Sequence, residues 1–112
     1  MTYSKTLTAL ADPTRRKLFD RLRRKDHTVG ELAWAARISQ PAASQHLRVL
    51  RDARLVTSRK DGTRHYYRVS ARGVAELRRY VESMWDDVLE SFAGEDTAAK
   101  PNPNVRKRGK KR

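Results

Sequence analysis

The stretch Ser39-Gln-Pro-Ala-Ala-Ser-Gln-His-Leu-Arg-Val-Leu50 has the residue order of a capped amphipathic helix. Serine is a favourable N-cap residue, and proline fits a first helical turn because that turn leaves its backbone N–H groups unpaired. The apolar positions then recur at steps of three and four residues: Ala43, Leu47 and Leu50. This pattern predicts a helix over Gln40–Ala53 with one buried face and one polar face.

Three further helices are predicted before this stretch. Residues 3–10 hold Tyr3, Leu7 and Leu10 at helical spacing. Asp12-Pro13 begins a second helix that runs to about Arg24, because Asp is a good N-cap and Pro fits the first helical position. Thr28 and Glu31 have the spacing of a capping box and begin the third helix. The turn Arg37-Ile38-Ser39 then leads into the fourth.

A β-hairpin and a long helix are predicted after residue 53. The β-prone runs Leu55–Arg59 and His65–Val69 flank a segment that contains Asp61-Gly62, and Asp-Gly between such runs is a strong hairpin signal. Over residues 71–92, helical spacing returns in the apolar positions Val74, Leu77, Val81, Met84, Trp85, Val88, Leu89 and Phe92.

Two short helices joined by a tight turn and followed by a hairpin form a winged helix-turn-helix. We therefore predict a mainly α fold (α+β) over residues 1–93, with four helices, a β-hairpin wing and a last helix. Residues 100–112 carry seven Lys or Arg, two prolines and a single aliphatic residue. Such a segment cannot bury enough apolar surface to order itself, so we predict a disordered basic tail over 94–112.

The composition excludes several classes of protein. The chain has 112 residues and no cysteine, which excludes disulfide scaffolds and thiolate metal sites. No apolar run approaches the ~18 residues of a transmembrane helix, and no secretory signal is visible. We find no nucleophile–base pair and no Gly-rich phosphate loop, so an enzyme is not expected. These features predict a cytoplasmic, nucleoid-associated protein.

The charge of the chain points to a polyanionic partner. There are 26 Lys and Arg against 13 Asp and Glu, a net charge of +13. Residues 1–79 hold 19 cationic and 7 acidic residues, whereas residues 80–99 hold six acids and no Lys or Arg. Nucleic acid is the expected partner of the basic body. A merely soluble basic protein and a membrane-surface binder are the alternatives.

The polar face of the predicted helix 40–53 has residues suited to double-stranded DNA. Gln can contact adenine through two hydrogen bonds, and Ser can serve a base or a phosphate. The base-reading candidates are Gln40, Ser44 and Gln45. The candidates for phosphate or other contacts are Thr28, Ser39, His46, Arg48 and Arg51, with an intramolecular contact as the alternative for His46. The alternative for the whole face is a solvated surface with no partner.

The hairpin carries its own basic residues beside the Asp-Gly turn. Basic side chains on such a wing can lie along a phosphate backbone or enter the minor groove. The wing candidates are Arg59, Lys60 and Arg64. Lys and Arg also protect exposed strand edges from aggregation, which is the alternative role for these residues.

Three motifs resemble the ArsR/SmtB family of bacterial repressors, and together they span residues 4–92. Leu10–Leu18 is similar to the family's opening signature, Ser39–Leu50 to its recognition helix, and Leu55-Val56 with Asp61–Tyr67 to its wing. The resemblance implies a homodimeric repressor that binds a palindromic operator and dimerises through its first and last helices. The expected interface residues are Leu7, Leu77, Val81, Met84, Trp85 and Val88.

The chain departs from this family in two places. Arg54 stands where the family commonly has a glycine in a left-handed conformation, which costs another residue roughly 1 kcal/mol. Metal-responsive members have Cys-x-Cys directly after Glu-Leu, where this chain has Ala33-Trp34-Ala35, and its three histidines are scattered: His27, His46 and His65. We therefore predict no metal site and no cofactor. Trp34 and Trp85 are expected in the core or an interface.

These observations predict a sequence-specific, homodimeric transcriptional repressor that acts on its own or a neighbouring promoter and does not respond to metals. The sequence identifies no small-molecule inducer. One alternative is a non-specific architectural nucleic-acid binder driven by the basic body and tail. Another is a winged helix used as a protein-interaction module.

Overall fold

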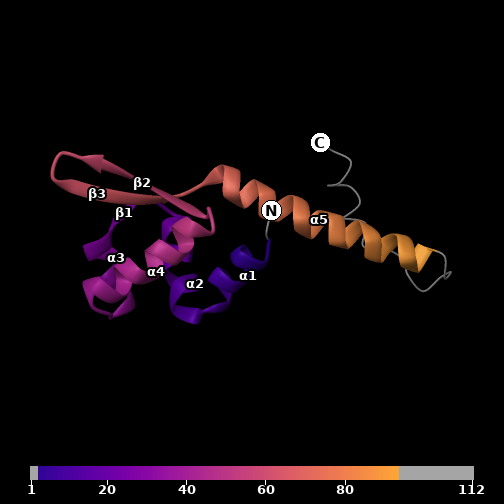
Figure 1. Ribbon diagram of the computed structural model, residues 1–112, viewed down its shortest axis with the longest axis horizontal. Helices are drawn as coiled ribbons and strands as arrows, with labels where there is room; N and C mark the ends of the chain where they lie inside the picture. Colours follow the sequence, from indigo (N-terminus) through magenta and orange to yellow (C-terminus); the bar gives the residue numbers. More distant parts are fainter. Residues whose placement is uncertain (1–2, 94–112) are drawn as a thin grey trace. The chain divides into compact units, whose positions relative to one another are not determined.

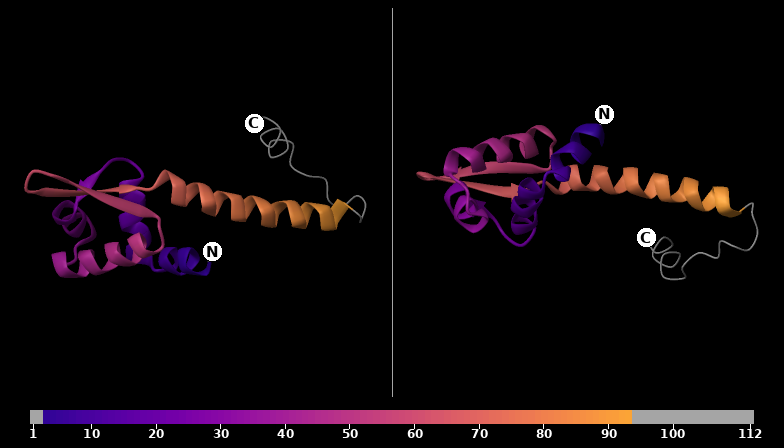
Figure 2. Two further views of the ribbon diagram at one scale, coloured as in Figure 1. Left: turned by 45° about the horizontal axis from the view of Figure 1, so that its top comes forward. Right: turned by 90° about the horizontal axis from the view of Figure 1, so that it is seen from below.

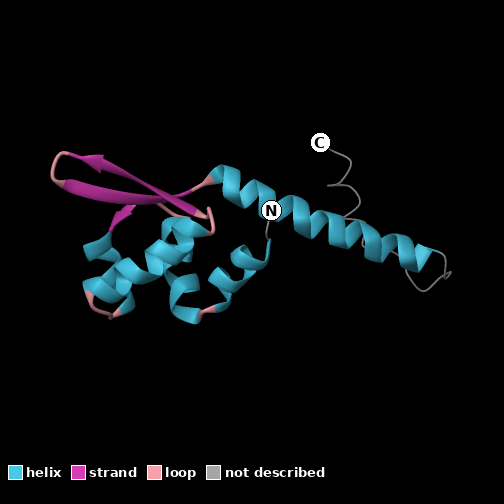
Figure 3. Ribbon diagram, in the orientation of Figure 1, coloured by secondary structure: helices cyan, strands magenta, loops and turns pink. Residues whose placement is uncertain are grey.

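The computed structural model describes residues 3–93 (Figures 1 and 3). The predicted order of four helices, a hairpin and a last helix is confirmed, and so is the winged helix-turn-helix. The elements are α1 (Tyr3–Ala11), α2 (Pro13–Leu22), β1 (His27–Thr28), α3 (Val29–Ala36), α4 (Gln40–Asp52), β2 (Val56–Asp61), β3 (Arg64–Val69) and α5 (Ala71–Ala93). The predicted basic tail lies outside the described residues.

The sheet contains one strand that the sequence did not predict. β1 pairs with β3 through His27 opposite Tyr67 and Thr28 opposite Tyr66, and the antiparallel order is β1-β3-β2. A strand of two residues is too short to show alternation. The wing strands also run further than predicted, so that only Gly62 and Thr63 join Asp61 to Arg64. Gly62 has a φ of +69°, which glycine adopts without steric cost.

The chain divides into two units, Met1–Arg78 and Arg79–Arg112, and the boundary falls within α5. In the first unit, α2, α3 and α4 lie on one side of the sheet, and the tip of the β2–β3 hairpin projects beyond them (Figure 2). The described part of the second unit is the remainder of α5, residues 79–93. None of the described helices has the length and apolar character needed to cross a membrane.

Five fully buried leucines form the centre of the first unit: Leu18, Leu32, Leu47, Leu50 and Leu55. They come from α2, α3, α4 and the turn after α4. Each fully buried leucine contributes about 1.5–3 kcal/mol through the loss of apolar surface from water. The predicted apolar stripe of α4 is thus confirmed. Trp34 does not belong to this core, because its side chain on α3 is 84% exposed.

Helices α3 and α4 end in the same way, with an arginine in the left-handed region. Arg37 has a φ of 59° and Arg54 a φ of 65°. In α4 the N–H of Leu55 donates to the carbonyl of Leu50 at 3.0 Å, and the N–H of Arg54 donates to that of Arg51 at 2.9 Å. This pair of bonds is a Schellman motif, which usually has glycine at the left-handed position. The turn therefore keeps the left-handed backbone at residue 54, although the residue there is Arg and not Gly.

The first turn of α5 packs directly against the turn that follows α4, which contains Arg54. A Cβ atom on Gly73 would lie 1.7 Å from the carbonyl oxygen of Arg54, so no side chain fits there. The backbone N–H of Ser70 donates to the carbonyl of Leu55 at 2.9 Å, and the Ser70 hydroxyl accepts from the N–H of Gly73 at 3.2 Å. The start of α5 is thereby joined to the end of α4 through backbone atoms.

We predict that Gly73→Ala lowers the free energy of unfolding by about 1–3 kcal/mol or more, because the new methyl group must push the two backbones apart. Urea denaturation monitored by circular dichroism measures this change. Gly30→Ala is the matched control, since a Cβ there meets nothing closer than the flexible Gln40 side chain at 3.3 Å. The control should be as stable as the parent or more stable. Equal stability of the Gly73 variant would contradict the close approach.

Candidate nucleic-acid interface

The polar face of α4 is held outward by the packing of its other face. The Ser39 hydroxyl accepts a hydrogen bond from the N–H of Ala42 at 3.1 Å and begins the helix. Ala43, Leu47 and Leu50 are fully buried, which fixes the rotation of α4 about its axis. The three base-reading candidates are all exposed as a result: Gln40, Ser44 and Gln45.

The structure brings four of the candidate contacts on α4 into one surface hollow of about 780 Å³. These are Ser44, Gln45, Arg48 and Arg51, which line it together with Tyr67 of β3. Gln40 lies elsewhere, next to Gly30 near the start of α3. Pro41 and Asp52 complete the lining, so the hollow combines amide, hydroxyl and guanidinium groups, which contact base edges and phosphates, with one carboxylate.

Thr28 and Ser39 each cap a helix through the hydroxyl oxygen, and the hydroxyl proton remains available for a hydrogen bond to another molecule. The Thr28 hydroxyl accepts from the N–H of Glu31 at 3.1 Å, and the Glu31 carboxylate accepts from the N–H of Thr28 at 3.1 Å, which completes the predicted capping box. Ser39 caps α4 in the same manner. A hydroxyl that accepts in a cap still has its own O–H proton to donate. Both residues can therefore cap a helix and donate to a phosphate oxygen.

The wing residues fall into two groups. Lys60 and Arg64 are exposed, and no carboxylate of residues 3–93 lies within 4.0 Å of them. Arg64 and Thr28 line one hollow of about 510 Å³, so the wing tip and the start of α3 are adjacent. Arg59 instead lies 3.6 Å from Asp26, 3.9 Å from Asp61 and 5.1 Å from the centre of the Tyr66 ring. Its charge is already partly compensated within the wing.

His46 makes an intramolecular contact that involves a residue the sequence did not single out. The Arg15 guanidinium donates to the carbonyl of Ala9 at 2.9 Å, and its Nη1 lies 3.4 Å from Nδ1 of His46. Arg16 donates to the carbonyl of Leu10 at 2.8 Å. Two adjacent arginines of α2 therefore satisfy carbonyls at the end of α1, and one of them also reaches α4.

The three histidines do not converge, as their scatter along the chain suggested. His27 contacts Glu31 at 3.1 Å, and His65 contacts the Ser58 hydroxyl at 3.2 Å, whereas His46 faces Arg15. Within residues 3–93 there is no group of three His, Cys, Asp or Glu side chains that could hold a metal ion. Indifference to metals stays a prediction, because a dimer can bring ligands of two copies of the chain together.

Apolar side chains remain exposed on both units. On α5 the exposed ones are Val81, Met84, Trp85, Val88 and Phe92, each between 41% and 47% exposed. On α1 Leu7 is 45% exposed, and Leu77 near the start of α5 is half-buried. A row of large apolar side chains along one helix is typical of a surface that another molecule covers. This row contains most of the predicted interface residues.

Comparison with known proteins agrees with this geometry. The sequence profile of the bacterial regulatory proteins of the arsR family matches residues 12–58. An HTH-type transcriptional regulator of Mycobacterium tuberculosis is 44% identical over 95 residues, which cover 80% of this chain and 89% of that protein. The chain belongs to the ArsR family.

Two further relatives indicate what ArsR-family proteins do. The transcriptional repressor SdpR of Bacillus subtilis is 41% identical over 59 residues, which cover 53% of this chain and 66% of SdpR. A homodimeric winged helix-turn-helix DNA-binding domain from Mycobacterium bovis has a TM-score of 0.62 and 33% identity, and the match covers 79% of this chain and 82% of that domain. The chain is thus a DNA-binding transcriptional regulator of the ArsR family and not an enzyme.

Two carboxyl groups that cap helices of the first unit have lowered pKa values. The hydrogen bond from the Arg15 backbone N–H holds the pKa of Asp12 below its ordinary value near 3.8. For Glu31 the hydrogen bond from the Thr28 backbone N–H, followed by that from His27, lowers the pKa below its ordinary value near 4.5. A carboxyl group with a lowered pKa stabilises the fold above its ordinary pKa, and this contribution is lost as the pH falls through the lowered value.

We predict that the free energy of unfolding falls as the pH drops below about 4.5, and that Asp12→Asn with Glu31→Gln reduces this slope. Asn and Gln can still accept the capping hydrogen bonds, so stability at neutral pH should change little. Urea denaturation at a series of pH values measures both quantities. An identical slope in the double variant would show that other groups govern the loss at acid pH.

Proposed function

We propose that this ArsR-family regulator is a homodimeric repressor that recognises a palindromic operator by sequence and acts without a metal ion. The observation that carries the proposal is the polar face of α4, where Ser44, Gln45 and Arg48 share one exposed hollow. Glutamine can discriminate adenine through paired hydrogen bonds, whereas a surface made only of cations cannot read sequence.

The remaining candidates position α4 in the major groove. Arg48 and Arg51 have no carboxylate of residues 3–93 within 4.0 Å, so their charges are available for phosphates. Thr28 and Ser39 add hydroxyl donors, and Lys60 and Arg64 extend the contacts along the wing. Arg59 contributes less in this proposal, because Asp26 and Asp61 compete with phosphate for its guanidinium.

The dimer supplies both the symmetry and the mechanism of repression. Two copies related by a two-fold axis present two α4 helices to two half-sites, which accounts for a palindromic operator. The apolar row of α5 and Leu7 supplies the interface in this proposal. A dimer bound across a promoter blocks the access of polymerase to that DNA, so repression needs no direct contact between the dimer and polymerase. SdpR, a relative of this chain, is named as a repressor.

A non-specific architectural binder is the second candidate, and the net charge of +13 favours it. The two candidate functions predict opposite effects for the removal of residues 94–112 and for substitutions on α4. If the basic tail is the main determinant, removing residues 94–112 erases any preference for the operator and substitutions on α4 have no effect. If α4 reads the sequence, the truncation weakens binding to all DNA alike and the operator preference remains.

We predict that Gln45→Ala and Arg48→Ala fail differently on the operator identified by footprinting DNA upstream of the gene. Gln45→Ala should cost about 1–3 kcal/mol on the operator and leave binding to random DNA and the salt dependence unchanged. Arg48→Ala should weaken binding to both DNAs and lower the salt slope by about 0.9. Fluorescence anisotropy at two salt concentrations measures both. Uniform weakening by Gln45→Ala would overturn specific readout by this residue.

We also predict that Val81→Asp dissociates the dimer, because an aspartate in the apolar row is either buried unpaired or keeps the copies apart. Light scattering should show monomer or aggregate. Ser83→Asp is the matched control: it adds the same charge on the opposite side of α5, and that variant should remain dimeric. A dimeric Val81 variant would place the interface elsewhere.

Finally, we predict that operator affinity changes by no more than a few-fold when Zn²⁺, Ni²⁺ or Cd²⁺ is added or chelated. The chain has no cysteine and its histidines have separate partners. The measurement is the same DNA titration with each metal and with a chelator. A tenfold change, about 1.4 kcal/mol, would reveal a site formed between two copies of the chain.

A further inference from the structure

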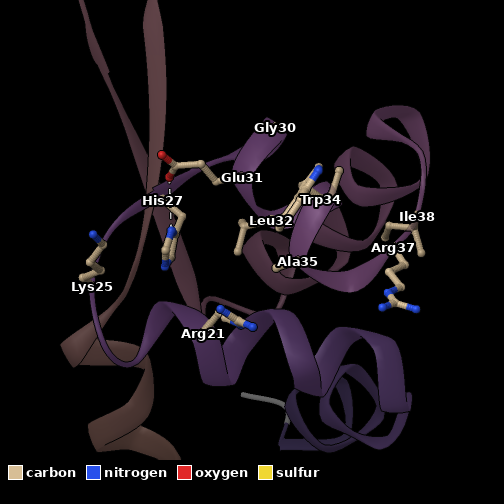
Figure 4. Close-up of a pocket in the computed structure, with 11 residues that line it drawn as sticks. Arg21, Lys25, His27, Gly30, Glu31, Leu32, Trp34, Ala35, Arg37 and Ile38 are labelled. Atoms are coloured by element: carbon tan, nitrogen blue, oxygen red, sulfur yellow. Dashed lines mark hydrogen bonds and ion pairs between the residues drawn. The ribbon is translucent and has the colours of Figure 1, made fainter.

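A second hollow of the first unit, of about 940 Å³, lies beside α3 and contains none of the residues proposed to contact DNA. Figure 4 shows it between α2, which contributes Arg21, and the end of α3, where Arg37 and Ile38 lie. Trp34 and Ala35 of α3 line it as well. The hollow therefore combines apolar and cationic side chains on a surface that the proposed function leaves unused.

Trp34 is the unusual feature of this hollow. Its side chain is 84% exposed, although an indole group gains more than almost any other side chain from leaving water. The other apolar residues nearby are shielded from water, since Leu32 and Ala33 are buried and Ile38 is half-buried. Tryptophan is also among the residues most enriched at the energetic centres of protein interfaces. An exposed Trp beside an apolar floor thus offers an anchoring point to a partner.

The charged side chains that line the hollow carry a net positive charge, from three cations and one carboxylate. Arg21, Lys25 and Arg37 line the hollow, and no carboxylate of residues 3–93 lies within 4.0 Å of their charged groups. The acidic residue of the lining, Glu31, is engaged by the N–H of Thr28 and by His27. A partner that covers the indole must therefore bring negative charge to meet these three cations.

We propose that this hollow is a docking site for an acidic segment of another protein, whose apolar side chain covers Trp34 while its carboxylates pair with Arg21, Lys25 and Arg37. Duplex DNA fits less well, because its phosphates meet the cations but leave the indole in water. A second copy that presents the same hollow fits less well, since like charges would face each other. None of the residues proposed to contact DNA lines this hollow, although Gly30 at its edge lies next to Gln40.

The test uses the full chain and a fluorescently labelled peptide that carries Phe and Leu among Glu and Asp residues. Anisotropy should show binding that is at least tenfold weaker for Trp34→Ala, a change that alters no charge. Binding should weaken equally when the Phe and Leu of the peptide become Ser, or when its acids become Gln and Asn. Affinity of Trp34→Ala equal to that of the parent would overturn the proposal, because the peptide would then bind by charge alone.

Charge reversal gives a second and independent arm. Arg21→Glu with Lys25→Glu should abolish binding of the acidic peptide and gain binding of the same peptide with Lys in place of its acids. The matched control, Lys17→Glu with Arg24→Glu, reverses two exposed cations of the same segment that do not line the hollow, and should bind the acidic peptide nearly as the parent does. Equal losses in both pairs would overturn the proposal.

Two further measurements on Trp34→Ala separate the other occupants. Its affinity for operator DNA should equal that of the parent, which also shows that the variant is folded. Its oligomeric state by light scattering should be unchanged. A loss of DNA affinity would assign the hollow to nucleic acid, and a change of oligomeric state would assign it to a second copy. Either result would overturn the proposal of an acidic protein partner.

Discussion

The burial of Leu47 and Leu50 is the constraint on which the remaining arrangement depends. With Leu18 and Leu32 these side chains form a core from three helices, and all four are fully buried. Because a helix has 3.6 residues per turn, fixing this face also fixes the direction of every other side chain on α4. Ser44, Gln45 and Arg48 point outward for that reason alone. The packing of buried leucines, none of which is proposed to contact DNA, thus decides the direction of the proposed DNA-reading face.

The same core also determines how the ends of α4 connect to its neighbours. Arg37 and Arg54 occupy left-handed positions where glycine would be about 1 kcal/mol less strained. In the turn after α4, Leu55 follows Arg54 directly and is fully buried. The removal of the Leu55 side chain from water offsets the strain at Arg54. Gly73 then allows the first turn of α5 to approach the Arg54 carbonyl. Residue 54 therefore adopts the left-handed conformation without the glycine that is common in the family, because the packing around it offsets the strain.

Much of the fold was predictable because its signals are local. Asp12, Thr28 and Ser39 each precede a helix, and their caps depend on residues within three positions. What the sequence did not show depends on distant partners. Examples are the two-residue strand β1, the contact of Arg15 with His46 and the pairing of Asp26 with Arg59 and Arg68. Trp34 was expected in the core or an interface because it is aromatic, but its position two residues after the buried Leu32 puts it on the opposite face of α3, where its side chain is 84% exposed.

The distribution of positive charge explains why a net charge of +13 does not by itself define the function. Some cations are used within the fold: Arg15 and Arg16 bind carbonyls of α1, while Arg59 and Arg68 share Asp26. Their contribution to attraction at long range remains, but their hydrogen-bonding groups are occupied. Three groups of cations that have no carboxylate of residues 3–93 within 4.0 Å lie in distinct places, on the exposed face of α4, at the wing tip and around the hollow beside α3. A uniform polyanion would use all three regions alike, whereas their separation lets one surface contact DNA while another receives a partner of different chemistry.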